Sequence, residues 1–74
     1  MGKLMNPTPA QIREARESAG LSQTAAAELI HSSRSSWAQW EAKEGGSTHR
    51  AMHPAMWELF LIKTNQHEKF NQPG

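Results

Sequence analysis

The sequence predicts an all-α fold: one compact domain of four to five helices within 74 residues. Three observations predict it. Serine, threonine and proline stand where helices begin, apolar residues recur behind them at helical spacing, and glycine follows the first run as a stop signal. The expected helices span about 9–19, 23–30, 34–43 and 54–64. We expect one folded domain over 8–66, between a flexible arm at 1–7 and a tail at 67–74.

The first helix has clear start and stop signals. Thr8 and Gln11 form a capping box around Pro9, which occupies the first helical position. Apolar residues from Ile12 onward share one face, and Gly20 is placed to end the helix in a left-handed conformation.

Two short helices joined by a tight turn follow. Ser22 and Ser33 each precede a helical run and can accept a hydrogen bond from a free backbone N–H group. Ala26 and Ala27 lie on one face of the first of these helices, and their small side chains let another helix approach closely. The pattern therefore predicts a closely packed helix pair.

The helix after Ser33 has two dissimilar faces. The side chains at positions i, i+3 and i+4 predict the buried face and belong to Trp37, Trp40 and Glu41. Nearly the opposite direction is taken by Ser35, Gln39 and Ala42. The outward face is small and polar and carries Arg34, Ser35, Ala38 and Gln39. These donors and acceptors suit base edges, and their small size lets a helix enter a major groove. The sequence therefore predicts a surface that reads duplex DNA.

The same residues resemble a known family. G-L-S-Q at 20–23, Ala27, S-R-S-S-W at 33–37 and W-E at 40–41 resemble, without a gap, the helix-turn-helix family of lambdoid phage repressors and Cro-like regulators. The resemblance covers about 12–41, and W-x-x-W-E at 37–41 also resembles the small regulators of phage anti-CRISPR operons. It implies a lambda-repressor-like domain in a dimeric transcriptional repressor that reads a palindromic operator and often controls its own operon.

The resemblance also implies roles for individual residues. Base edges would be contacted by Arg34, Ser35 and Gln39. The DNA backbone would be contacted by Gln23, at the start of the supporting helix, and by Ser33 and Ser36. Arg16 and Glu41 would form an internal ion pair between the first helix and the recognition helix, which follows Ser33.

Two positions depart from the family pattern. His31 stands where a left-handed glycine is usual, which costs a residue with a Cβ atom about 1 kcal/mol. Ser32 stands where a buried valine is usual. We therefore expect a differently shaped turn, with the large Trp37 filling the space that Ser32 leaves.

The segment after Glu41 reads as a flexible loop rich in glycine and polar residues. Lys43, Thr48 and Arg50 would lie close to bound DNA and could contact phosphates. A solvated loop without contacts is an equally supported interpretation for each of these residues.

The last helix starts at His53-Pro54, with Met52 placed to pack on Trp57. Its apolar residues cover most of its circumference. We expect the core to be closed by Met56, Leu59, Phe60 and the stem of Lys63, which leaves Trp57, Leu61 and Phe70 as surplus. A twofold dimer with Trp57 and Leu61 in its interface is the favoured explanation, because it would set two reading helices about 34 Å apart. The alternative is a fifth helix from 65–70 that covers these residues.

Composition excludes several other classes. Net charge is only +1, so any basic surface must be local, and tight DNA binding would need two subunits. There is no cysteine, and the longest apolar run, 59–62, is too short to span a membrane. We expect a cytoplasmic protein without cofactor, metal or small-molecule effector.

Other chemical interpretations are weaker. His49 and His53 are four residues apart, but Pro54 places His49 outside the helix and no carboxylate pattern completes a metal site. The serines beside His31 have no orienting acid, so an enzyme is not expected. The tryptophans at 37 and 40 fit a core better than a base-stacking surface. An antitoxin-like or other partner-binding module remains the alternative function.

Overall fold

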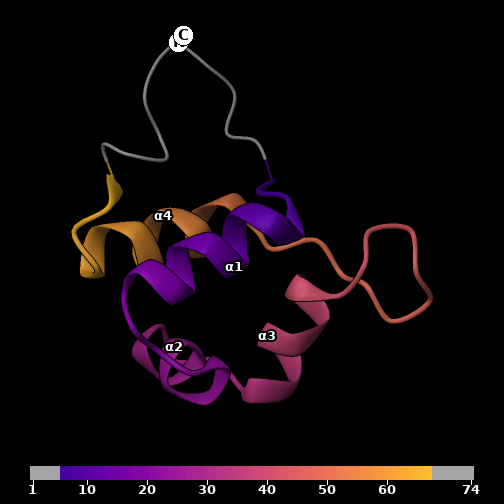
Figure 1. Cartoon of the computed structure of the whole chain (residues 1–74), viewed down its shortest axis with the longest axis horizontal. Helices are drawn as coiled ribbons and strands as arrows, with labels where there is room; N and C mark the ends of the chain where they lie inside the picture. The colour runs from indigo at the N-terminus through magenta and orange to yellow at the C-terminus, as the bar shows by residue number, and fades with distance from the viewer. Residues whose placement is uncertain (1–5, 68–74) are drawn as a thin grey trace, which may run out of the picture.

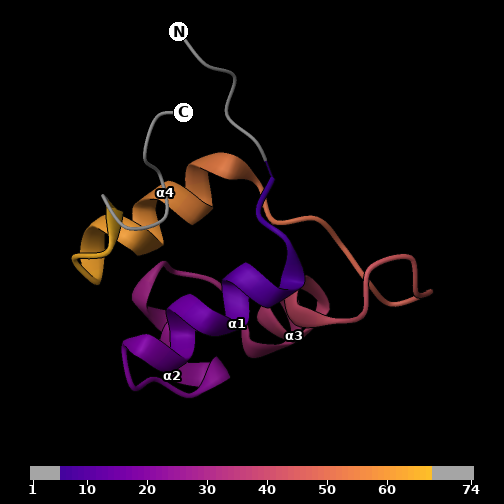
Figure 2. The ribbon, with the colours of Figure 1, turned by 45° about the horizontal axis from the view of Figure 1, so that its top comes forward.

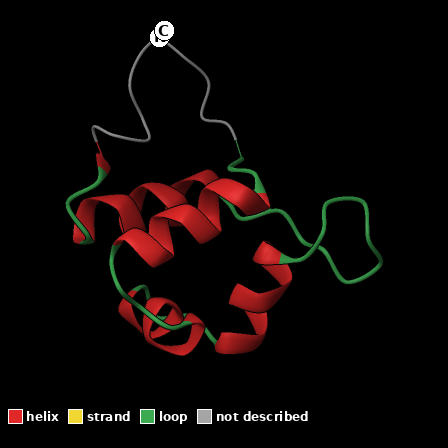
Figure 3. Cartoon of the chain, viewed as in Figure 1, coloured by secondary structure: helices red, strands yellow, loops and turns green. Residues whose placement is uncertain are grey.

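Four helices form the part of the chain that the computed structural model describes, residues 6–67, and no strand occurs there (Figures 1 and 3). They are α1 (Pro9–Ser18), α2 (Gln23–Leu29), α3 (Arg34–Glu41) and α4 (Pro54–Lys63). Each begins at the predicted residue and ends one or two residues before the predicted end. The predicted all-α fold is confirmed.

Side-chain caps fix where the helices begin. Thr8 Oγ1 accepts from the Gln11 N–H at 3.1 Å, and Gln11 Oε1 accepts from the Thr8 N–H at 2.9 Å, which completes the capping box. Ser22 and Ser33 accept from the backbone N–H three residues later, at 3.0 and 3.1 Å. His53 caps α4 by accepting through Nδ1 from the Ala55 N–H. These caps satisfy donors that have no partner within the helix.

Left-handed residues end three of the helices. Gly20, His31 and Asn65 follow α1, α2 and α4 with φ values of 72°, 62° and 60°. In each case the next residue donates its N–H back to the helix, as Ser32 does to the Ala27 carbonyl at 2.8 Å. The expectation of a differently shaped turn is therefore wrong. His31 adopts the glycine-type conformation, because the two hydrogen bonds of this motif hold it there.

The core forms around Trp37 of α3. Its ring meets the ring of Trp40 at a centroid distance of 5.5 Å and that of Phe60 at 4.9 Å, both edge to face. α2 contacts α3 and α4, and α1 contacts α3. Ala26 and Ala27 are fully buried, which allows the close approach that their size predicts.

α4 buries Phe60 as expected, and Met56 packs against the core, but the rest of its buried face differs from the expected one. Trp57 and Leu61 belong to the core of the single chain, whereas Leu59 and Ile62 are exposed. The assignment of Trp57 and Leu61 to a dimer interface is therefore corrected. Because almost every position of α4 is apolar, the sequence alone does not define its buried face. Met52, also fully buried, packs in the same core as Trp57.

The folded segment extends beyond the expected domain at its N-terminal end. Pro7 is buried, and Asn6 Nδ2 donates to the Met52 carbonyl at 2.9 Å, so these two residues are part of the fold and not of a flexible arm. After α4, Gln66 Nε2 donates to the Ala15 carbonyl at 2.9 Å. The expectations for the arm at 1–5, for the tail at 68–74 and for Phe70 concern residues outside the described range.

Candidate nucleic-acid interface

The two faces of α3 differ in burial. Trp37, Trp40 and Glu41 are buried, whereas Arg34 and Ser35 are exposed. Gln39 is half-buried, and no hydrogen bond of its side-chain amide is found within residues 6–67. α3 therefore presents a guanidinium, a hydroxyl and an amide away from the core, while its aromatic residues face inward.

The start of α3 carries two hydroxyl groups that contact each other. Ser33 Oγ donates to Ser36 Oγ at 3.1 Å and also caps the helix. Ser33 is exposed and Ser36 is half-buried. Both hydroxyls therefore lie at the N-terminal end of α3, beside Arg34 and Ser35.

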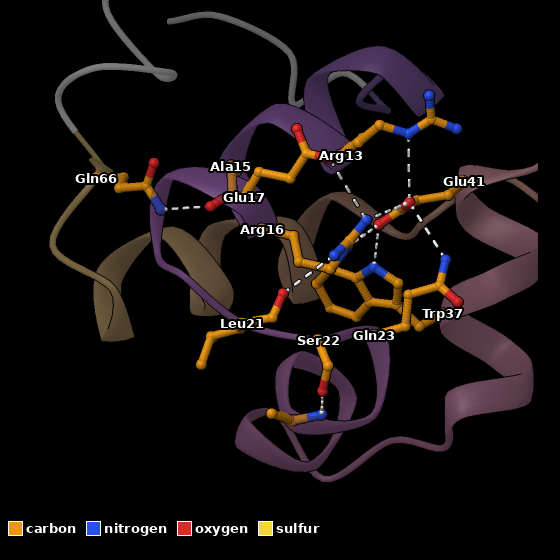
Figure 4. Close-up of polar contacts among 11 residues, drawn as sticks. Arg13, Ala15, Arg16, Glu17, Leu21, Ser22, Gln23, Trp37, Glu41 and Gln66 are labelled. Carbon is orange, nitrogen blue, oxygen red and sulfur yellow. Dashed lines mark hydrogen bonds and ion pairs between the residues drawn. The ribbon is translucent and has the colours of Figure 1, made fainter.

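A buried carboxylate at the C-terminal end of α3 joins three helices (Figure 4). Glu41 of α3 accepts from Arg16 of α1 through both oxygens, at 2.6 Å from Nε and 3.2 Å from Nη2. Gln23 of α2 donates to the same carboxylate at 3.3 Å. Arg16 also donates through Nη1 to the Leu21 carbonyl at 3.0 Å, which fixes the connection between α1 and α2. The Arg16–Glu41 pair thus sets how α3 is held against α1.

Electrostatics favour the charged form of this carboxylate. Burial raises the pKa of Glu41, but the hydrogen bonds from Arg16, Trp37 and Gln23 and the positive charge of Arg16 outweigh burial. The pKa of Glu41 is therefore held below its ordinary value. The hydrogen bond to Glu41 raises the pKa of Arg16, so both members of the pair are ionised near neutral pH.

Sequence reasoning missed three partners in this junction. The indole N–H of Trp37 donates to Glu41 at 2.6 Å, Gln23 donates from α2, and Arg13 Nε lies 3.6 Å from Glu41 Oε1. The i, i+4 spacing of Trp37 and Glu41 was a usable signal, as was the i, i+3 spacing of Arg13 and Arg16. The amide of Gln23 was expected at a phosphate; in the structure it is turned toward Glu41.

The segment between α3 and α4 extends away from the helices (Figures 1 and 2). The returning part of this segment is tied to α3, because the Arg50 N–H donates to the Gln39 carbonyl at 3.0 Å. A turn in which Gly46 N–H donates to the Lys43 carbonyl reverses the chain between them, with Gly45 at a φ of 88°. Lys43, Thr48 and Arg50 are exposed, and Arg50 lies beside the C-terminal half of α3.

The model of a family described as a helix-turn-helix domain matches residues 10–60. The chain belongs to this helix-turn-helix family. The match includes all of α2 and α3, all of α1 except Pro9, and most of α4. No curated protein is significantly similar to the chain.

In this helix-turn-helix domain, α2 and α3 with the left-handed turn at His31 form the motif itself. Membership of this family supports DNA binding. Within residues 6–67 no group of three metal-ligating side chains is close enough to hold a metal ion. No helix in the same range is both long and apolar enough to cross a membrane.

Proposed function

We propose that this helix-turn-helix protein is a sequence-specific regulator of transcription that binds double-stranded DNA through α3. In this proposal Arg34, Ser35 and Gln39 contact base edges in the major groove. A dimer covers a palindromic operator and represses transcription, and the operon that encodes the protein is a natural target. In this proposal operator occupancy follows protein concentration.

The division of α3 into a buried aromatic side and an uncovered polar side carries this proposal. Arg34 has a planar donor group that suits the two acceptors of guanine, and the amide of Gln39 suits adenine. Arg34 is exposed in the first turn of α3, and Gln39 is half-buried and lies nearly opposite Trp37 around the helix. Because Glu41 fixes α3 to α1 and α2, the reading side chains extend from a rigid support.

Backbone contacts would position α3 in the groove. The side chains proposed for this role are those of Gln23, Ser33, Ser36, Lys43, Thr48 and Arg50. The hydrogen bond between Arg50 and Gln39 supports the inclusion of the loop, because it holds the loop against α3. These contacts would contribute affinity without sequence preference.

A homodimer is part of the proposal, with a revised interface. Ile62 is 57% exposed and Leu59 lies one turn before it on α4, so these two residues form the apolar surface that a second copy would cover. With a net charge of only +1, one subunit has weak electrostatic affinity for DNA. A dimer would bind DNA more tightly, because binding of the second α3 is intramolecular once the first is bound.

Selection of bound fragments from random duplex DNA tests the proposal. We expect enrichment of a palindrome whose half-sites are about one helical turn apart. Recovery of a single half-site would contradict the dimer but would still support sequence-specific DNA binding. Absence of any enriched sequence would contradict the proposed function.

A second candidate function, a partner-binding helix-turn-helix module, is favoured by the exposure of Ile62 and Leu59. In that case α4 would dock another protein. A mobility shift with selected DNA distinguishes the two functions. Retention by the purified protein alone supports the regulator, and retention only with a copurified partner supports the module.

A further inference from the structure

One arginine at the three-helix junction is bound less firmly than the other. The side chain of Arg13 is 60% exposed, and its Nε lies 3.6 Å from Glu41 Oε1, beyond hydrogen-bond distance. Its two Nη groups point away from the carboxylate (Figure 4) and donate to no other residue within 6–67. Arg13 therefore has donors left for a ligand that approaches from solvent.

The charges at the junction are unequal. Glu41 carries one negative charge, and Arg16 binds both of its oxygens at hydrogen-bond distance. Arg16 therefore already neutralises Glu41, and the positive charge of Arg13 is left without a counter-charge at this carboxylate. Glu17 lies 4.0 Å from Arg16 Nη2 but is 63% exposed, so solvent screens most of its effect. An anion beside Arg13 would meet a net attraction.

The chemistry of Arg13 favours a phosphate group. A planar guanidinium whose two Nη groups are free binds two phosphate oxygens at once. Gln23, on α2, is bound to the same oxygen of Glu41 that Arg13 faces, so both side chains lie at the junction that supports α3. A DNA strand bordering the groove occupied by α3 would pass the exposed side of this junction.

We propose that Arg13 binds a backbone phosphate of duplex DNA beside α3, with the amide of Gln23 as its neighbour. This inference rests on the proposed function, because it places the DNA along α3. Arg13 would exchange its long contact with Glu41 for the phosphate, while Arg16 keeps Glu41 paired. Arg13 thus adds affinity and orientation without contributing to sequence preference.

The salt dependence of binding tests the role of Arg13. The full chain would be titrated with a labelled mixed-sequence duplex of about three helical turns at several salt concentrations. Arg13→Gln should lower affinity and reduce the slope of log affinity against log salt by about 0.9 per bound chain. Arg13→Lys should retain most of the slope. Lys63→Gln, which removes an exposed charge at the end of α4, is the matched control and should leave the slope unchanged.

The outcomes separate the two proposals. An unchanged slope in Arg13→Gln, with normal binding by the unsubstituted protein, overturns the phosphate contact alone. A lowered thermal midpoint with an unchanged slope also overturns it, because that result shows a structural role only. If the unsubstituted protein binds no duplex, the proposed function and the Arg13 contact both fail.

Discussion

The indole Nε1 of Trp37 donates a hydrogen bond to Oε2 of Glu41 at 2.6 Å, four residues further along α3. The bond joins the largest fully buried side chain of the core to the carboxylate that holds Arg16. The same helix therefore connects the hydrophobic core to the polar junction. The position of α3 depends on both.

Trp37→Phe should be more destabilising than loss of ring size alone predicts. Phenylalanine cannot donate to Glu41, and a hydrogen bond to a charged group contributes about 1.5 to 3 kcal/mol. Trp40→Phe is the matched control, because no hydrogen bond of the Trp40 indole is found within residues 6–67. Urea unfolding should show the larger loss for Trp37→Phe. Equal losses would show that the bond to Glu41 contributes little.

Stability should fall at acid pH through Glu41. Its pKa in the folded protein lies below the value for an unfolded glutamate, which is about 4.3. The stabilisation is therefore complete above that value and is lost as pH falls through the lower, folded pKa. Urea midpoints from pH 6 downward should decline less steeply in Glu41→Gln than in the unsubstituted protein. Glu28→Gln, at an exposed position of α2, should retain the full decline.

Substitution of His31, whose backbone is left-handed, should change the stability of the protein. At a φ of 62° a Cβ atom is unfavourable, so His31→Gly should stabilise the protein by up to about 1 kcal/mol, less the added chain entropy of glycine. His31→Val should destabilise it, since β-branched residues avoid this region. Glu28→Gly, within α2, should cost about 1 kcal/mol and controls for glycine itself. Stabilisation by valine at 31 would contradict the assigned backbone conformation.

The exposed apolar residues of α4 should control assembly. Ile62→Glu places a charge on the proposed dimer surface and should shift sedimentation toward monomer while the thermal midpoint of the monomer stays unchanged. Trp57→Ala should instead unfold the chain, because Trp57 is in the core and its removal costs about 3 to 5 kcal/mol. An unchanged sedimentation profile for Ile62→Glu would locate the dimer contact elsewhere or exclude it.

Local signals made much of the fold predictable. The helix starts depend on neighbouring residues, so Thr8, Ser22 and Ser33 could be assigned from sequence, and the caps of the structure agree. The buried face of α4 could not be assigned, because its apolar residues surround the helix and only packing against the other elements selects Trp57 and Leu61.

The site was predictable where it depends on one helix. The uncovered side of α3 follows from the periodicity of its tryptophans. Arg13 and Gln23 both lie close to Glu41 because of the way α1 and α2 pack against α3. Spacing along the chain does not predict this packing. Residue type alone gives the wrong turn at His31, because hydrogen bonds from the His31 and Ser32 N–H groups to α2 hold its backbone in the left-handed conformation.

The most direct measurement compares Gln39→Ala with the unsubstituted protein for binding to a selected operator and to a mixed-sequence duplex. Loss of the amide should reduce the preference for the operator by about 1 to 3 kcal/mol, or about 5- to 150-fold, while the thermal midpoint stays unchanged. Lys63→Ala should retain the preference. If Gln39→Ala folds normally and still prefers the operator to the same degree, then Gln39 does not read a base; the same result for Arg34→Ala would contradict DNA reading by α3.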